Sequence, residues 1–354
     1  MSRIMLAYLA SWQQCDISAL PVEKLTHLCY AFAKVVDGEV IEQDAGDPLL
    51  SNAAYCQKIC AQLQQLKLRN PALKILISIG GWGADGFSDA ALTETSREQF
   101  SRSTLRFMQK YQFDGVDLDW EYPSNAMAGI KARPEDRQNF TLMLSALRIH
   151  LDDASAQMER SSPYLLTIAA GVGTYYLEGV ELEKVAAKCD FINLMTYDFY
   201  NGWATRAGHH ANLLTAAHDP SGDSADRGVQ LFLDHGVAAE KMVLGCPFYG
   251  RSLLGVASPG LGAEGRAQSN GTHSYYKIAN ELIPSGHFTR HWDESAQVPW
   301  LYDGDEFISY EDAESIALKG QYVKQHGLAG AMFWEYTEDQ SNVLLDVLWQ
   351  NLQD

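Results

Sequence analysis

The amino-acid sequence predicts an α/β fold, a (β/α)8 TIM barrel with a small α+β insertion domain between its seventh and eighth strands. Eight short apolar runs recur along the chain, and longer amphipathic segments follow them, as expected of parallel strands joined by helices. The length supports the same prediction, because 354 residues exceed the roughly 250 of a typical barrel.

The expected strands are the apolar runs, each of which is short enough for one strand of a barrel. They are predicted at 4–8, 27–33, 74–80, 115–121, 165–171, 191–196, 242–247 and 330–334. The helices are predicted near 52–69, 96–110, 134–153, 178–188, 224–236, 311–325 and 341–352.

The stretch between the last two expected strands, 250–308, is too long for a simple connection. It carries Gly, Pro, Tyr and Trp without helical periodicity, so we expect a small α+β subdomain there. The barrel is then expected to comprise 1–249 and 309–354.

Composition narrows the classes of partner. The chain has 27 Lys and Arg against 45 Asp and Glu, a formal charge of -18, which would repel nucleic-acid phosphates and anionic lipid headgroups. We therefore expect no nucleic-acid partner and no membrane partner, whereas a neutral polysaccharide is compatible with this charge. We also expect a monomer.

The six cysteines are too sparse for a disulfide framework, and we expect them to be thiols. Cys56 and Cys60 are spaced to share a helical face, but no nearby Cys or His completes a zinc-like set. Calcium loops starting at Asp114 or Asp117 lack the required glycine and glutamate. Neither a metal nor another cofactor is expected.

The N-terminus has one basic residue and an apolar run too short for a signal peptide, so it is expected to form the first strand. No run reaches the roughly 20 apolar residues of a membrane helix. The expected location is the cytoplasm, or outside the cell by a non-classical route or after removal of a signal.

The most informative segment is 113–123, on the fourth expected strand. Side chains alternate along a strand, so Asp117, Asp119 and Glu121 share one face, with about 6 to 7 Å between successive α-carbons on it. The other face is apolar and can pack under the outer helices, which leaves three carboxyls pointing into the barrel. The alternative interpretation is a solvated acidic strand, which the large intervening apolar residues disfavour.

Burying unpaired charges costs several kcal/mol each, so this arrangement opposes stability and suggests a function. Closely spaced carboxylates do not all ionise easily, and at least one is expected to hold a proton near neutral pH, as a general acid must. Glu121 lies nearest the C-terminal end of the strand, where barrel enzymes place reacting groups, so we predict that it is the acid.

At these residues the sequence resembles glycoside hydrolase family 18, the chitinases. The family signature Asp-Gly-x-Asp-x-Asp-x-Glu is matched by Asp114, Gly115, Asp117, Asp119 and Glu121. Further matches, which extend the resemblance over nearly the whole chain, lie at 30–32, 78–82, 195–198, 247–251 and 330–334. The 250–308 stretch resembles the chitinase insertion domain of this family.

The resemblance implies hydrolysis of chitin or chitooligosaccharides by a retaining mechanism in which the substrate's N-acetyl oxygen is the nucleophile. It implies that Glu121 protonates the leaving oxygen and then activates water, and that Asp119 orients the acetamido group. Asp117 would share a proton with Asp119, and Tyr197 would donate a hydrogen bond to the acetamide oxygen.

Substrate-binding residues are also implied by the resemblance, with Trp334 as the platform on which the reacting sugar stacks. The pocket and sugar contacts would be completed by Tyr8, Phe32, Met195, Trp82, Asp198, Tyr249 and Arg251. Trp12 and Trp203 are candidates for outer subsites, although core packing is an alternative for each lone aromatic residue.

The sequence departs from the family at one loop, where many relatives carry a Trp-Glu pair and this chain has Trp203 followed by Ala204. His209 and His210 are interpreted as structural. Two alternative functions stay open: a non-catalytic chitooligosaccharide-binding protein, which the retained Glu121 disfavours, and an endo-β-N-acetylglucosaminidase, which the insertion disfavours.

Overall fold

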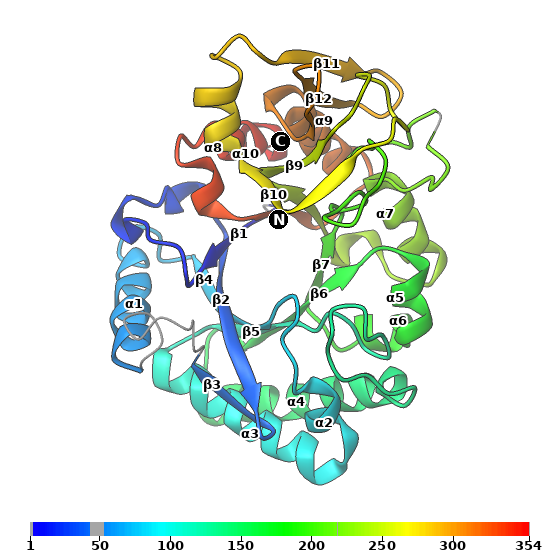
Figure 1. Cartoon of the computed structure of the whole chain (residues 1–354). Coiled ribbons are helices and arrows are strands. Elements are labelled where there is room, and N and C mark those ends of the chain that lie inside the picture. Colours follow the sequence, from blue (N-terminus) through cyan, green and yellow to red (C-terminus); the bar gives the residue numbers. More distant parts are fainter. Residues whose placement is uncertain (1–2, 43–52, 218, 354) are drawn as a thin grey trace. The chain divides into compact units, whose positions relative to one another are not determined.

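The computed structural model describes residues 3–42, 53–217 and 219–353. Eight parallel strands form a closed barrel, which confirms the predicted fold class (Figure 1). The barrel strands are β1 (Ile4–Ala10), β2 (His27–Val36), β4 (Lys74–Gly80), β5 (Gly115–Asp119), β6 (Leu165–Gly171), β7 (Phe191–Met195), β8 (Met242–Pro247) and β14 (Gly330–Trp334). Their order is β1-β14-β8-β7-β6-β5-β4-β2, and β1 also pairs with β2.

Helices follow most of these strands, as predicted. They are α1 (Ala53–Leu66), α2 (Phe87–Leu92), α3 (Glu94–Tyr111), α4 (Asp136–Gln157), α5 (Thr174–Gly179), α6 (Leu182–Ala186), α7 (Ala225–Asp234), α9 (Ala313–Gln325) and α10 (Val343–Leu352). The predicted helix over 178–188 is wrong in its extent, because extended backbone at Val180 separates α5 from α6. Position 52, where the first helix was expected to start, lies outside the described residues.

The contacts of the chain divide into two units. The N-terminal unit comprises Leu6–Asn193 and His235–Lys241, and the C-terminal unit comprises Met1–Met5, Leu194–Asp234 and Met242–Asp354. Among the described residues, no helix combines the length and the apolar character needed to span a bilayer.

In the N-terminal unit, the side chains of β5 alternate as the sequence predicted. Val116 and Leu118 are buried, and Trp120 stacks on Phe87 of α2 with 5.4 Å between ring centroids. The strand ends at Asp119, two residues before the predicted end, because its pairing with β4 stops at Gly80. Gly80 has a φ of +119°, and a Cβ there would lie 2.1 Å from the Asp119 carbonyl oxygen, so glycine is required.

In the C-terminal unit, a five-stranded antiparallel sheet lies in the chain between β8 and β14. In sheet order it consists of β10 (Arg266–Ser274), β9 (Tyr249–Leu254), β13 (Phe307–Ser309), β12 (Val298–Tyr302) and β11 (Thr289–Asp293). Small apolar clusters stabilise it, one of them around Leu253, Val256 and Phe307. The separate insertion domain over 250–308 stays a prediction, because this sheet belongs to the same unit as β8 and β14.

Candidate active site

Three carboxyl side chains lie at the C-terminal end of β5 and just beyond it. Asp117 is fully buried, Asp119 is 5% exposed, and Glu121, which follows the strand, is 8% exposed. Water therefore solvates these groups poorly, and neighbouring protein groups decide which of them carries a proton.

Neutral donors surround Asp117. One carboxylate oxygen accepts hydrogen bonds from Tyr8 (2.9 Å) and Ser78 (2.7 Å), and the other accepts from Thr167 (2.7 Å) and Asn193 (3.1 Å). Because the Asn193 amide also donates to the Tyr8 hydroxyl, the Tyr8 proton is directed at Asp117. Burial raises the pKa of Asp117, and the four hydrogen bonds, first that from Thr167, oppose the shift.

Asp119 lacks comparable support, and its Oδ1 atom is buried with no hydrogen-bond partner among the described residues. Burial, then the charge of Glu121, then that of Asp117 raise the pKa of Asp119 well above its usual value. If Asp117 and Asp119 share one proton, it is therefore bound mainly by Asp119. The reason is that the hydrogen bonds around Asp117 stabilise its ionised form.

Aromatic side chains accompany the carboxyls in the N-terminal unit. Tyr122, next to Glu121, packs edge-to-face with Trp82 (6.4 Å) and with Tyr175 (5.2 Å). Trp82 is 48% exposed. Phe32 is buried and stacks on Trp12. Sequence analysis named Trp82, Phe32 and Trp12, but it missed Tyr122 and Tyr175.

In the C-terminal unit, Asp198 follows β7 and is held by cationic and phenolic donors. Arg251 donates from Nε (2.7 Å) and Nη2 (2.5 Å), and the Tyr249 hydroxyl donates at 2.9 Å. His210 Nδ1 lies 3.5 Å from the same carboxylate. Burial would raise the pKa of Asp198, but the interactions with His210 and Arg251 outweigh it and hold the pKa well below its usual range.

Three other predicted residues lie at strand ends of the same unit. Met195 is the last residue of β7, and the Tyr197 ring packs edge-to-face with Tyr249 at 6.4 Å. Trp334 is the last residue of β14, where it pairs with Pro247 of β8. Both Met195 and Trp334 are only partly buried, so each exposes part of its side chain.

The turn after Trp334 carries two further acids that sequence analysis did not single out. Glu335 is buried and accepts hydrogen bonds from the backbone N–H and the hydroxyl of Thr337. Burial, then the charge of Glu335, raises the pKa of Glu338 to about 7. Two glutamates three residues apart were the available sequence signal, but their burial could not be inferred from it.

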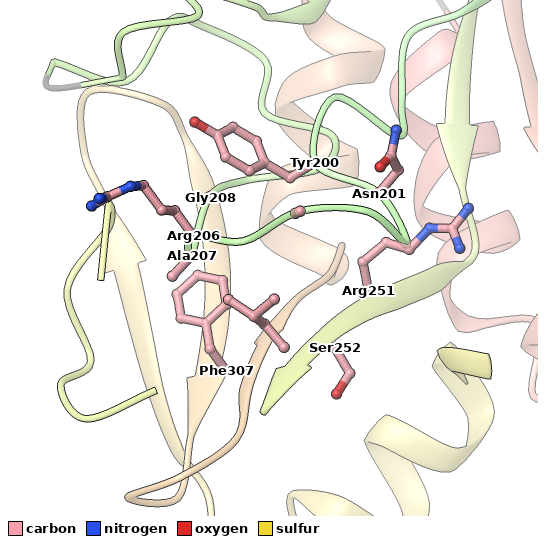
Figure 2. A pocket seen from close by; sticks show the side chains of 10 residues that line it. Tyr200, Asn201, Arg206, Ala207, Gly208, Arg251, Ser252 and Phe307 are labelled. Carbon is pink, nitrogen blue, oxygen red and sulfur yellow. The ribbon is translucent and has the colours of Figure 1, made fainter. Parts of the chain in front are cut away.

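Beside Arg251 the structure forms a pocket between the 200–208 loop and the five-stranded sheet (Figure 2). Tyr200, Arg206 and Phe307 line it, and Figure 2 shows Arg206 and Arg251 on opposite sides of it. Trp203, in the same loop, is 67% exposed. The loop therefore presents an aromatic side chain to solvent beside this pocket.

Among residues 3–42, 53–217 and 219–353, no group of three or more His, Cys, Asp or Glu side chains could hold a metal ion. The side chains around the end of β5 supply carboxyl groups, hydroxyls and aromatic rings. Buried carboxyls at a strand end, one of them biased toward its protonated form, are suited to general acid and base catalysis.

Comparison with known families agrees with this chemistry. The profile described as Glycosyl hydrolases family 18 matches residues 4–339. The chain belongs to glycosyl hydrolase family 18. The resemblance that the Asp114–Glu121 signature predicted is thus confirmed.

Individual family 18 relatives are similar over most of the chain. Chitinase A1 of Niallia circulans is 43% identical over 313 residues, which are 82% of this chain but only 44% of that protein. The solved family 18 N-acetylglucosaminidase from Paenibacillus barengoltzii is 39% identical with a TM-score of 0.88, and 99% of each chain is covered. A mutant class V chitinase from Nicotiana tobaccum, solved in complex with NAG4, is 26% identical with a TM-score of 0.86, and 99% of each chain is covered.

Proposed function

We propose that this family 18 chain hydrolyses β-1,4 linkages between N-acetylglucosamine units of chitin or chitooligosaccharides by a retaining, substrate-assisted mechanism. The observation that carries the proposal is the row of buried carboxyls at the end of β5, with Asp117 fully hydrogen-bonded and Asp119 biased toward its protonated form. The chitinase names of the relatives support the choice of substrate.

Glu121 is the proposed general acid and base. It lies beyond the end of β5 and is almost buried, so a bound sugar would exclude the remaining water and strengthen its hydrogen bond to the leaving oxygen. After the glycosidic bond breaks, the deprotonated Glu121 takes a proton from the water that attacks the intermediate.

Asp119 and Asp117 control the charge near the acetamido group. As the acetamido oxygen attacks C1, positive charge develops on that group, and an ionised Asp119 stabilises it. The proton then has to pass to a neighbouring carboxyl. Asp117 can accept it because the Ser78 and Thr167 hydroxyls can rotate from donors into acceptors.

The groups of the C-terminal unit bind and orient the sugar in this proposal. Tyr197 donates a hydrogen bond to the acetamide oxygen, and Trp334 stacks on the apolar face of the pyranose. Asp198, fixed as an anion by Arg251, accepts hydrogen bonds from sugar hydroxyls. We assign a further sugar contact to Met195 in this unit, and sugar contacts in the N-terminal unit to Tyr8, Phe32 and Trp82.

Replacing Glu121 with glutamine tests the proposal. Glutamine has nearly the same shape but carries no transferable proton, so kcat on a fluorogenic chitobioside or chitotrioside should fall by about 10² to 10⁴. The exposed Glu240→Gln variant is the matched control and should keep the wild-type rate. Wild-type rates for Glu121→Gln would overturn the assignment, and chitotetraose binding in calorimetry without product would favour a binding protein.

A second candidate function is exo-acting release of single N-acetylglucosamine units. The Paenibacillus barengoltzii N-acetylglucosaminidase favours it, because its chain matches this one over 99% of both lengths. A time course on chitohexaose separates the two candidates. Early release of the monosaccharide alone indicates exo action, whereas early dimers and trimers indicate a chitinase.

A further inference from the structure

Helix α1 carries two thiols that the proposed reaction does not use. Cys56 and Cys60 lie four residues apart, and their Sγ atoms are separated by 3.8 Å. Cys56 is half-buried and can be reached from solvent, whereas Cys60 is 2% exposed. The pair therefore combines an accessible sulfur with a protected one in contact with it.

The two thiols differ in acidity. The hydrogen bond from Cys60 lowers the pKa of Cys56 more than burial raises it, and a hydrogen bond from Tyr111 adds to the lowering. Glu42 opposes this shift and Lys110 favours it. The hydrogen bond that Cys60 donates to Cys56 raises the pKa of Cys60, and burial raises it further. Cys56 is thus the nucleophilic sulfur, and Cys60 keeps its proton.

Three of the other cysteines lack an accessible thiol. Burial raises the pKa of Cys29, Cys189 and Cys246, and all three are buried. Cys15 is half-buried and provides an internal comparison for accessibility. A reactive thiolate beside a resolving thiol is the arrangement found in oxidation-sensitive sites.

We propose that Cys56 and Cys60 form a reversible oxidation site that reacts with hydroperoxides. The Cys56 thiolate attacks the peroxide oxygen, so that the O–O bond breaks, hydroxide leaves and Cys56 becomes a sulfenic acid. The Cys60 thiol then attacks the Cys56 sulfur, an S–S bond forms and water leaves. The peroxide is reduced, and the two thiols are oxidised by two electrons.

Closing this disulfide requires a local change in the helix. Cβ atoms four residues apart on a helix are about 5 to 6 Å from each other, whereas a disulfide needs about 3.5 to 4.5 Å. Helix α1 begins at Ala53, so Cys56 lies among the first four residues, whose N–H groups have no partner within the helix. That turn can unwind at small cost, and a thiol reductant should reopen the strained bond.

Peptide mapping after hydrogen peroxide treatment tests the site. Lys58 lies between the cysteines, so trypsin separates their peptides unless a disulfide joins them. We expect the joined peptides at low peroxide excess, their separation by a thiol reductant, and oxidation of Cys56 on the order of tenfold faster than of Cys15. Equal rates at Cys56 and Cys15, or sulfinic acid at Cys56 without joined peptides, would refute the proposal.

Two single variants separate the steps. Cys60→Ser should leave a sulfenic acid on Cys56 that dimedone traps, whereas Cys56→Ser should protect Cys60 from peroxide. Oxidation of Cys60 at an unchanged rate in Cys56→Ser would contradict the assigned order of attack. Neither cysteine belongs to the candidate active site, so both variants should keep the wild-type hydrolytic rate.

Discussion

The carboxyls at the end of β5 and the carboxylate of Asp198 show how the same functional group is prepared for different tasks. Asp117 is surrounded by neutral donors, and the pKa of Asp119 is raised by burial and by its acidic neighbours. Asp198 is clamped by the Arg251 guanidinium, and its pKa is lowered. The first arrangement allows a proton to move between groups, and the second fixes a negative charge.

The environment of the acid at the N-terminal end of β5 resembles that of Asp198. It differs from the environment of Asp117 within the strand. Asp114, immediately before the strand, accepts from Lys67 at 2.5 Å and lies 3.4 Å from Arg160. Ion pairs thus fix the end of the strand away from the reacting groups, while neutral donors surround Asp117 in its interior. Within one short segment, the acid before the strand is thus ion-paired, and Asp117 inside the strand accepts hydrogen bonds from neutral groups.

Among variants that distinguish the carboxyls of β5 from Asp198, the largest loss of kcat is expected for Asp119→Asn. Asparagine imitates the protonated carboxyl but cannot ionise, so it cannot stabilise positive charge on the acetamido group. We expect kcat on a fluorogenic chitobioside to fall by about 10² with a smaller change in KM, because the loss concerns the transition state. A rate within twofold of wild type would show that Asp119 acts only as a neutral group.

A smaller effect is expected for Arg251→Lys, which weakens the clamp on Asp198. Lysine keeps the charge but cannot make two parallel hydrogen bonds to one carboxylate. We expect kcat/KM to fall by about tenfold, mainly through KM, if Asp198 orients the bound sugar. Arg102→Lys, at an exposed ion pair with Glu98 on α3, is the matched control and should have little effect. Equal losses in both variants would exclude a specific role for the clamp.

Sequence reasoning predicted the regular parts of this fold because they follow from the hydrophobic pattern. The alternation along 113–123 predicted opposite faces for Asp117 and Trp120, and in the structure Asp117 contacts Ser78 and Thr167 of the neighbouring strands whereas Trp120 packs on Phe87 of α2. The pattern could not predict that β5 ends at Asp119, because the turn at Gly80 in the neighbouring strand determines where the pairing stops.

The sequence alone also could not identify the hydrogen-bond and packing partners that come from distant parts of the chain. Thr167 and Asn193 contact Asp117 across 50 and 76 residues of sequence, and nothing in their local pattern marks them. Tyr122 was visible beside Glu121, but its role in linking Trp82 to Tyr175 depends on ring packing. The signature therefore predicted the family and the position of the acidic residues, and the structure was needed to find the donors around Asp117.

The smallest expected effect extends the comparison to a third environment, that of Glu338. Its folded-state pKa of about 7 exceeds the usual value near 4.5, so the folded protein binds a proton that the unfolded chain releases between these pH values. This contribution to stability is fully present below about pH 4.5 and is lost as the pH rises through about 7.

Glu338→Gln removes the titration, so we expect a melting temperature a few degrees above wild type at pH 8 and no difference at pH 4.5. Thermal unfolding of both proteins across this range provides the measurement. A gain of equal size at every pH would mean that the amide improves packing and that burial beside Glu335 does not destabilise the ionised carboxyl.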